Sequence, residues 1–183
     1  MQVITLVSDL IDADDGRGIP MHTEVTTALS EWLARAQDGP KHAWAEWETR
    51  GVALLPLGRR FDAVRMPEPL VYAALDTTEP QEVARLLTQV LAGPVIYDGR
   101  TMGGTYYALV RPREQTDEPR AWKHEVAAPL LSDGTFLGVP RLDRTQPPGT
   151  HWVVPPAFEG DLCPERWVAA FVAKGRRASE ENA

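Results

Sequence analysis

Three arginines gathered around one aspartate are the residues of this chain best suited to hold a charged ligand. Arg59, Arg60 and Arg65 surround Asp62, directly after an apolar run at 52–57. Guanidinium groups match the geometry of phosphate and carboxylate, so the segment indicates an anion-binding loop. An apolar run bounded by glycines predicts a strand buried on both faces, which would present this loop at its end. The alternative is that the arginines pair with the protein's own carboxylates.

A second group combines glycine with aromatic residues. Gly103 and Gly104 precede a predicted strand at 105–110 that begins with Tyr106 and Tyr107 after one threonine. Paired glycines allow positive φ or a close backbone approach, and adjacent strand residues point to opposite faces. We therefore expect one tyrosine ring to be buried and the other to be available for stacking on a ligand. The alternative is a plain hairpin with an aromatic cross-strand pair.

Carboxylates are the remaining groups that offer chemistry. Asp62, Asp98 and Asp133 are the candidates for a displaced metal-binding set, and we expect them not to converge on one ion. The four histidines lack metal-ligand spacing, and the single Cys163 cannot form an internal disulfide. The sequence contains no Walker loop, no nucleophile elbow and no zinc-protease motif. We assign no catalytic residue, no metal ligand and no cofactor.

The charge of the chain limits its partners. Its 183 residues include 19 Lys and Arg against 26 Asp and Glu, a net charge of −7. This balance argues against non-specific nucleic-acid binding, which rests on phosphate neutralisation, although a local basic patch can still bind a nucleotide or a short strand. No apolar run reaches the roughly 18 residues of a membrane helix, and the first residues lack the basic start of a signal peptide. We expect a cytoplasmic protein with no membrane partner.

The pattern of apolar residues and breakers predicts the elements that position these groups. Helices are expected at 23–36, 40–50, 67–74, 79–91 and 164–174, and strands at 52–57, 95–97, 105–110, 135–139 and 151–154. Helices first and local β pairs later favour one α+β domain at 23–175, with a mixed or antiparallel sheet flanked by helices. Before it lies a segment at 1–22 with a candidate strand and an acidic turn, and after it a frayed tail at 176–183.

Four segments, taken in order, resemble the primase–polymerase (Prim-Pol) domain of the archaeo-eukaryotic primase superfamily, which is common in actinobacteria, plasmids and phages. They are a glycine-led strand ending Pro-Leu before basic residues and a proline (51–67), a Thr-Thr-x-Pro helix start (77–96), a Gly-Gly strand (103–109), and a glycine-rich strand, proline turn and aromatic strand (133–156). The resemblance covers roughly 40–156 and implies that the strands at 52–57 and 105–110 lie in one sheet.

Two departures from the family pattern shape the functional expectation. Active members carry an Asp-x-Asp pair, whereas the matching place here offers only Asp98, and the family's nucleotide-contacting histidine is replaced by Tyr106 or Tyr107. The resemblance thus implies a degenerate, non-catalytic module that binds a nucleotide, a short nucleic acid or a protein partner in a regulatory role. Two alternatives stay open: a protein-interaction domain without a nucleotide ligand, and a metal-dependent nucleotidyltransferase or hydrolase with relocated carboxylates. The sequence does not set the oligomeric state.

Overall fold

The computed structural model describes residues 21–100, 103–113 and 125–181. The candidate strand and acidic turn expected before Met21 lie outside the described residues. Short strands and helices follow one another along the described chain, which confirms the α+β class. None of the described helices is long and apolar enough to cross a membrane.

The elements follow the predicted order closely. The helices are α1 (Met21–Ala34), α2 (Pro40–Arg50), α3 (Glu68–Leu75), α4 (Pro80–Leu91) and α5 (Glu165–Glu181). The strands are β1 (Val52–Pro56), β2 (Asp62–Pro67), β3 (Val95–Asp98), β4 (Thr105–Val110), β5 (Leu130–Leu131), β6 (Phe136–Pro140) and β7 (His151–Val154). Every predicted helix and strand is present, with ends that differ by a few residues; β2 and β5 are additional.

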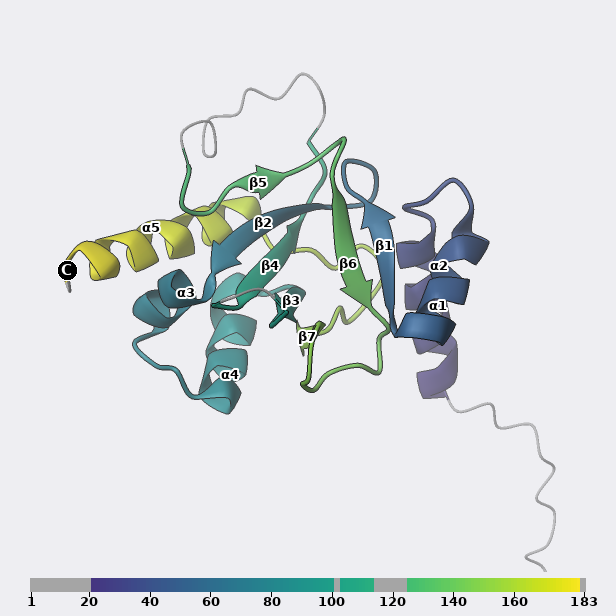
Figure 1. Ribbon diagram of the computed structural model, residues 1–183, viewed down its shortest axis with the longest axis horizontal. Coiled ribbons are helices and arrows are strands. Elements are labelled where there is room, and N and C mark those ends of the chain that lie inside the picture. Colours follow the sequence, from purple (N-terminus) through teal and green to yellow (C-terminus); the bar gives the residue numbers. More distant parts are fainter. Residues whose placement is uncertain (1–20, 101–102, 114–124, 182–183) are drawn as a thin grey trace, which may run out of the picture.

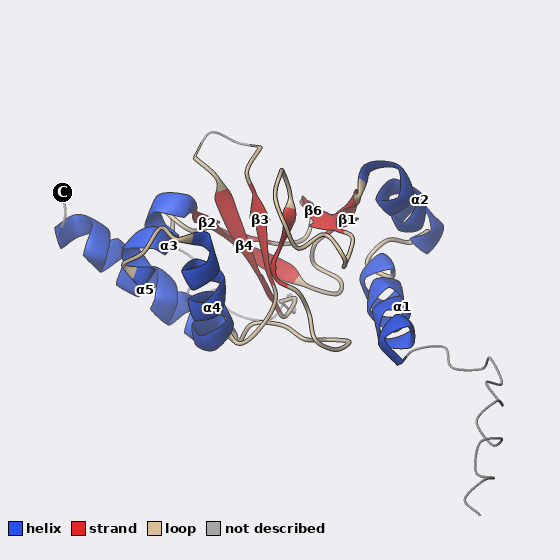
Figure 2. Ribbon diagram, turned by 90° about the horizontal axis from the view of Figure 1, so that it is seen from below, coloured by secondary structure: helices blue, strands red, loops and turns tan. Residues whose placement is uncertain are grey.

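The strands form two antiparallel sheets. β1 and β6 make a two-stranded sheet, which we call the ribbon, and the other strands make a five-stranded sheet in the order β5-β2-β4-β3-β7. The five-stranded sheet is covered on both faces, with α3, α4 and α5 on one side and the ribbon with α1 and α2 on the other (Figures 1 and 2). A hydrophobic core lies on each face of this sheet, and alternate residues of β4 pack into the two cores. Ala108 and Val110 face the helices, while Leu109 faces the ribbon.

Local signals explain how α2 is fixed beside the ribbon. Pro40 occupies the first turn of α2, and Gly51 ends it in the left-handed region at φ 70°, donating its N–H to the carbonyl of Trp47 at 3.0 Å. The buried Trp47 also donates its indole N–H to the carbonyl of Val139 in β6 at 2.9 Å. The C-terminus of α2 therefore lies directly against the ribbon.

The first correction concerns the arginine segment. The sequence predicts a loop around Arg65, but this residue lies on β2, which pairs with β4 on one side and β5 on the other. The strand was missed because Asp62, Arg65 and Pro67 interrupt its apolar pattern. Pairing with two neighbours outweighs the weak local propensity.

Three further expectations are wrong. The strands at 52–57 and 105–110 do not share a sheet, since β1 belongs to the ribbon and β4 to the larger sheet. β1 is not buried on both faces, because Leu54 is 53% exposed. The tail expected to fray from Arg176 continues as α5 to Glu181. The first of these differences removes the topological support for the Prim-Pol resemblance.

Candidate functional site

The three arginines singled out from the sequence point to different places. Arg59 lies on the turn between β1 and β2 and binds the Asp38 carboxylate, with a second contact from Nη2 to Oδ2 of 3.3 Å. The hydrogen bond from Arg59, together with its charge, lowers the pKa of Asp38. Arg60 is exposed on the same turn, and β2 carries Arg65 away from both. The sequence-based alternative of an internal ion pair therefore applies to Arg59, with Asp38 rather than Asp62 as its partner.

The structure does bring Arg65 beside a tyrosine. Arg65 is the cross-strand neighbour of Tyr107, whose half-buried ring lies against the ribbon-side core. Burial raises the pKa of Tyr107, and the Arg65 charge opposes that rise. Tyr106 points the other way and is buried, with its ring 4.8 Å from that of Tyr97. The prediction that adjacent tyrosines face opposite sides is confirmed, and only Tyr107 retains exposure.

The paired glycines take the conformation expected of them. Gly103 and Gly104 have φ values of 86° and 56°. A Cβ at Gly104 would clash with the Tyr97 hydroxyl and the Glu68 carboxylate, two groups joined by a hydrogen bond of 2.6 Å. Gly104 thus leaves room for this partly buried pair.

The candidate carboxylates lie apart. Asp62 and Asp98 pair with opposite ends of β4, opposite Val110 and Thr105 respectively. Asp133 is exposed on the turn between β5 and β6. Among the described residues, no group of three or more His, Cys, Asp or Glu is placed to hold a metal ion.

Asp62 and Asp98 also differ in their surroundings. Asp62 is fully buried and accepts hydrogen bonds on Oδ2 from the Ser132 hydroxyl at 2.8 Å and the Arg113 N–H at 3.1 Å. Its Oδ1 has no hydrogen-bond partner, and burial raises its pKa. Asp98 binds the Arg100 guanidinium through two contacts of 2.9 Å, which lower its pKa.

A different group of arginines lines a cleft of about 360 Å³ at the end of the ribbon. Arg50 comes from the end of α2, Arg100 follows β3, and Arg144 comes from the segment between β6 and β7. The rest of the lining consists of Glu46, Val52, Leu54, Gly138, Gly149 and Thr150. We call this the arginine cleft.

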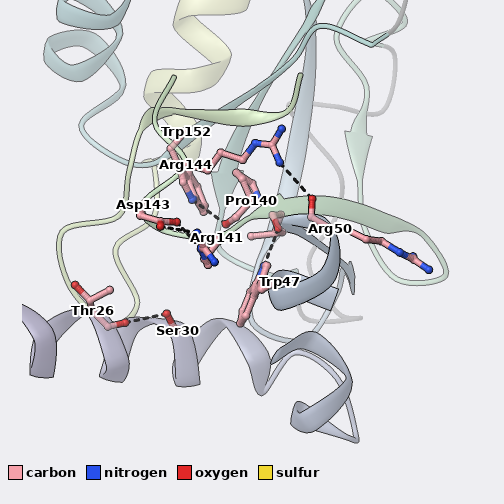
Figure 3. Close-up of polar contacts among 10 residues, drawn as sticks. Thr26, Ser30, Trp47, Arg50, Pro140, Arg141, Asp143, Arg144 and Trp152 are labelled. Carbon is pink, nitrogen blue, oxygen red and sulfur yellow. Dashed lines mark hydrogen bonds and ion pairs between the residues drawn. The ribbon is translucent and has the colours of Figure 1, made fainter. Parts of the chain in front are cut away.

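Arg144 is held in this cleft by the backbone around it. Its N–H bonds to the carbonyl of Arg141 and its carbonyl accepts from the N–H of Trp152, each at 2.9 Å. The fully buried Trp152 also donates its indole N–H to the carbonyl of Pro140 at 3.0 Å, which anchors the segment (Figure 3). The Arg144 backbone is therefore fixed from both sides.

The Arg144 guanidinium contacts only backbone oxygens within the described part of the chain. Nη1 donates to the carbonyl of Arg50 at 3.3 Å (Figure 3). Nη2 donates to the carbonyl of Pro148 at 3.1 Å. Two glycines leave room for it, since a Cβ at Gly51 would lie 2.7 Å from Nη1 and one at Gly149 would lie 3.4 Å from Nη2. Among the described residues, no carboxylate forms an ion pair with the Arg144 guanidinium.

The other two arginines are closer to carboxylates but face solvent. The Arg100 side chain is 61% exposed while it binds Asp98. Arg50 is 74% exposed and lies 3.6 Å from Glu46, whose other carboxylate oxygen accepts the Leu54 N–H at 2.9 Å. Both arginines can add donors to a ligand without breaking a buried contact.

Sequence reasoning missed this cleft because its arginines are far apart in the chain. Arg50 and Arg144 are separated by 94 positions, and no short motif joins them. A usable signal is Arg144 beside a proline- and glycine-rich turn, Pro147-Pro148-Gly149, because such a turn holds a side chain at the edge of a sheet.

Comparison with known proteins gives no relative from which a role can be transferred. No protein-family model matches the chain, and neither a curated protein nor a solved structure is detectably similar to it. The functional argument therefore rests on the geometry of the site.

Proposed function

We propose that this protein is a non-catalytic binding module whose ligand is an anion held in the arginine cleft. The observation that carries the proposal is the Arg144 guanidinium, which lies in the cleft with backbone carbonyls as its partners and with no ion pair to a described carboxylate. Glu46, the carboxylate in the lining, is engaged by Arg50 and by the Leu54 N–H. A phosphate or carboxylate would supply the missing negative charge. Charge-assisted hydrogen bonds of this kind are about twice as strong as neutral ones.

The cleft has the donors that such a ligand needs. Arg144 is fixed at its backbone, whereas Arg50 and Arg100 reach in from the two flanks. Planar guanidinium groups donate two parallel hydrogen bonds to a phosphate or carboxylate, and a side chain that is already fixed loses little freedom when the ligand binds. Gly138 and Gly149 keep the lining open between the arginines.

The ligands expected from the sequence are the compounds to use in testing this proposal. The Prim-Pol resemblance makes a nucleotide the first compound to test and a short nucleic acid the second. The proposal does not rest on that resemblance, because β1 and β4 lie in separate sheets. The alternative of a metal-dependent enzyme with relocated carboxylates has no support from geometry, because Asp62 and Asp98 lie at opposite ends of β4.

Calorimetric titration with pyrophosphate and ATP, without magnesium, tests the proposal. Wild-type protein is expected to bind at least one of them, and Arg144→Gln to bind it roughly 10-fold more weakly, equivalent to about 1.4 kcal/mol. Arg85→Gln is the matched control, because Arg85 is an exposed arginine on α4 that pairs with Glu82.

A second variant guards against local unfolding of the Arg144 segment. Arg50→Gln changes an exposed side chain on the same cleft and should also weaken binding. The proposal fails if neither anion binds the wild type, or if both cleft variants bind as tightly as Arg85→Gln does.

A further inference from the structure

The outer face of the ribbon carries exposed apolar side chains next to the arginine cleft. Inward-facing residues of β1 and β6 are buried, among them Leu55 and Val139. On the outward face, Leu54 is 53% exposed and Phe136 is 59% exposed. A two-stranded sheet with apolar residues on both faces has one face left to cover.

The two edges of the ribbon are treated differently. On β1, the Leu54 N–H is bound by Glu46 at 2.9 Å and its carbonyl by the Gln37 amide at 2.8 Å, so side chains block this edge. On β6, Gly138 lies opposite Leu54. Hydrogen-bonded and non-bonded residue pairs alternate along two antiparallel strands. Gly51 and Arg141 form a hydrogen-bonded pair, so Leu54 and Gly138, three positions further along, form a non-bonded pair. The N–H and carbonyl of Gly138 therefore point away from β1. Gly138 also has no side chain to obstruct a neighbouring strand.

The apolar face connects two clefts. Leu54 and Gly138 line the arginine cleft. Phe136 lines a second cleft of about 460 Å³, whose other lining residues include the apolar Pro56 and Leu57 and the charged Asp38, Arg59 and Asp133. An extended chain that follows β6 would therefore pass from the exposed Phe136 ring to the guanidinium groups at the other end.

We propose that the ribbon binds an extended acidic peptide of a partner protein, which places apolar side chains on Leu54 and Phe136 and a carboxylate in the arginine cleft. This inference rests on the proposed function and names its anion as a carboxylate. At about 3.3 Å per residue, β6 matches a peptide of about five residues. Main-chain bonds to Phe136 and Gly138 on the β6 edge would add affinity, as in other cases of strand addition. The edge ends at Pro140, which has no N–H and whose carbonyl accepts the Trp152 indole N–H.

Charge favours a peptide over a nucleic-acid strand at this surface. The protein carries a net charge of −7, which repels a ligand with one phosphate per nucleotide along its whole length. A peptide with an acidic end and an apolar body carries its negative charge only at the end that lies beside the arginines. Its apolar residues cover a surface that a phosphate backbone would leave in water.

The test uses two capped peptides of about seven residues, measured by calorimetry. Both alternate valine and threonine, and one ends in two aspartates while the other ends in two asparagines. Wild-type protein should bind the aspartate peptide at least about 10-fold more tightly. Phe136→Ser and Leu54→Ser should weaken that binding by a similar factor, because both side chains are exposed on the ribbon. Phe136→Ser should leave pyrophosphate binding unchanged, since Phe136 does not line the arginine cleft.

The outcomes separate the two proposals. If pyrophosphate binds in an Arg144-dependent way but the aspartate peptide does not, or if Phe136→Ser and Leu54→Ser bind the peptide as wild type does, the peptide inference is overturned and the anion site stands. If pyrophosphate fails and the peptide binds regardless of Arg144→Gln, the proposed function is overturned. Sedimentation of the wild type as a dimer that Leu54→Ser converts to a monomer would assign the face to a second copy and overturn the peptide.

Discussion

On the helix side of the five-stranded sheet, α5 packs against α3 so closely that a Cβ at Gly175 would lie 2.6 Å from the carbonyl oxygen of Leu70. On the ribbon side, the arginine cleft and the cleft beside Phe136 open to solvent, and Leu54 and Phe136 stand exposed between them. One face of the sheet is filled by helices, whereas the other is covered by a narrow ribbon that leaves charged and apolar groups available. On this comparison, we expect the helix side to matter most for stability, and we assign the proposed binding to the ribbon side.

The largest expected effect is on the helix side. Gly175→Ala inserts a methyl group against the backbone of α3, and overpacking of this kind costs about 2 kcal/mol. For a domain of this size the melting temperature should fall by roughly 4–8 °C. Anion binding at a temperature where the variant is folded should equal that of wild type. A stable Gly175→Ala variant with impaired binding would reverse the assignment of the two sides.

A buried carboxylate on the same side predicts a pH effect. Burial raises the folded-state pKa of Asp62, so the folded protein holds this proton at pH values where the unfolded chain has released it. The contribution of Asp62 to stability is therefore full below the ordinary aspartate pKa of about 3.9 and is lost as the pH rises through the folded value. Asp62→Asn removes the titration and should gain stability relative to wild type between about pH 4 and pH 7.

Melting temperatures of wild type and Asp62→Asn at those two pH values check this prediction, since the shifts of other carboxylates cancel in the difference. A difference between the two proteins that stays constant with pH would show that the Asp62 pKa is not raised by folding.

The smallest stability effect is expected on the ribbon. Phe136→Ser changes a side chain that is mostly in water, so the free energy of unfolding should change by no more than about 0.5 kcal/mol. Denaturant titration measures it. A loss above about 2 kcal/mol would mean that Phe136 is part of the core, and the ribbon face would then no longer count as an available surface.

Local signals in the sequence predicted the elements that have them. Gly39-Pro40 and Gly51 mark both ends of α2, and the Gly-Gly turn and alternating residues mark β4. β2 was missed because its pattern is interrupted by charge and proline, and it exists through pairing with β4 and β5. Strand partners depend on contacts between distant segments, which a single sequence does not specify, so β1 was assigned to the wrong sheet.

The same limit applies to the site. A cluster such as Arg59 and Arg60 is visible because its members are adjacent, yet Arg59 is bound by Asp38 across a turn. Arg50, Arg100 and Arg144 are single arginines in sequence, and they gather because α2, β3 and the β6–β7 segment end at one place. Sequence adjacency therefore predicted a patch at Arg59 and Arg60 that the structure does not support, and it gave no sign of the arginine cleft.

Amide chemical-shift mapping of the labelled protein during a pyrophosphate titration tests the central claim most directly, because it locates the anion without a mutation. The account predicts that the shifts gather at the arginine cleft, with Gly138, Gly149 and Thr150 among the most affected N–H groups. Shifts confined to the turn that carries Arg59 and Arg60, or shifts that follow no single surface, would contradict it.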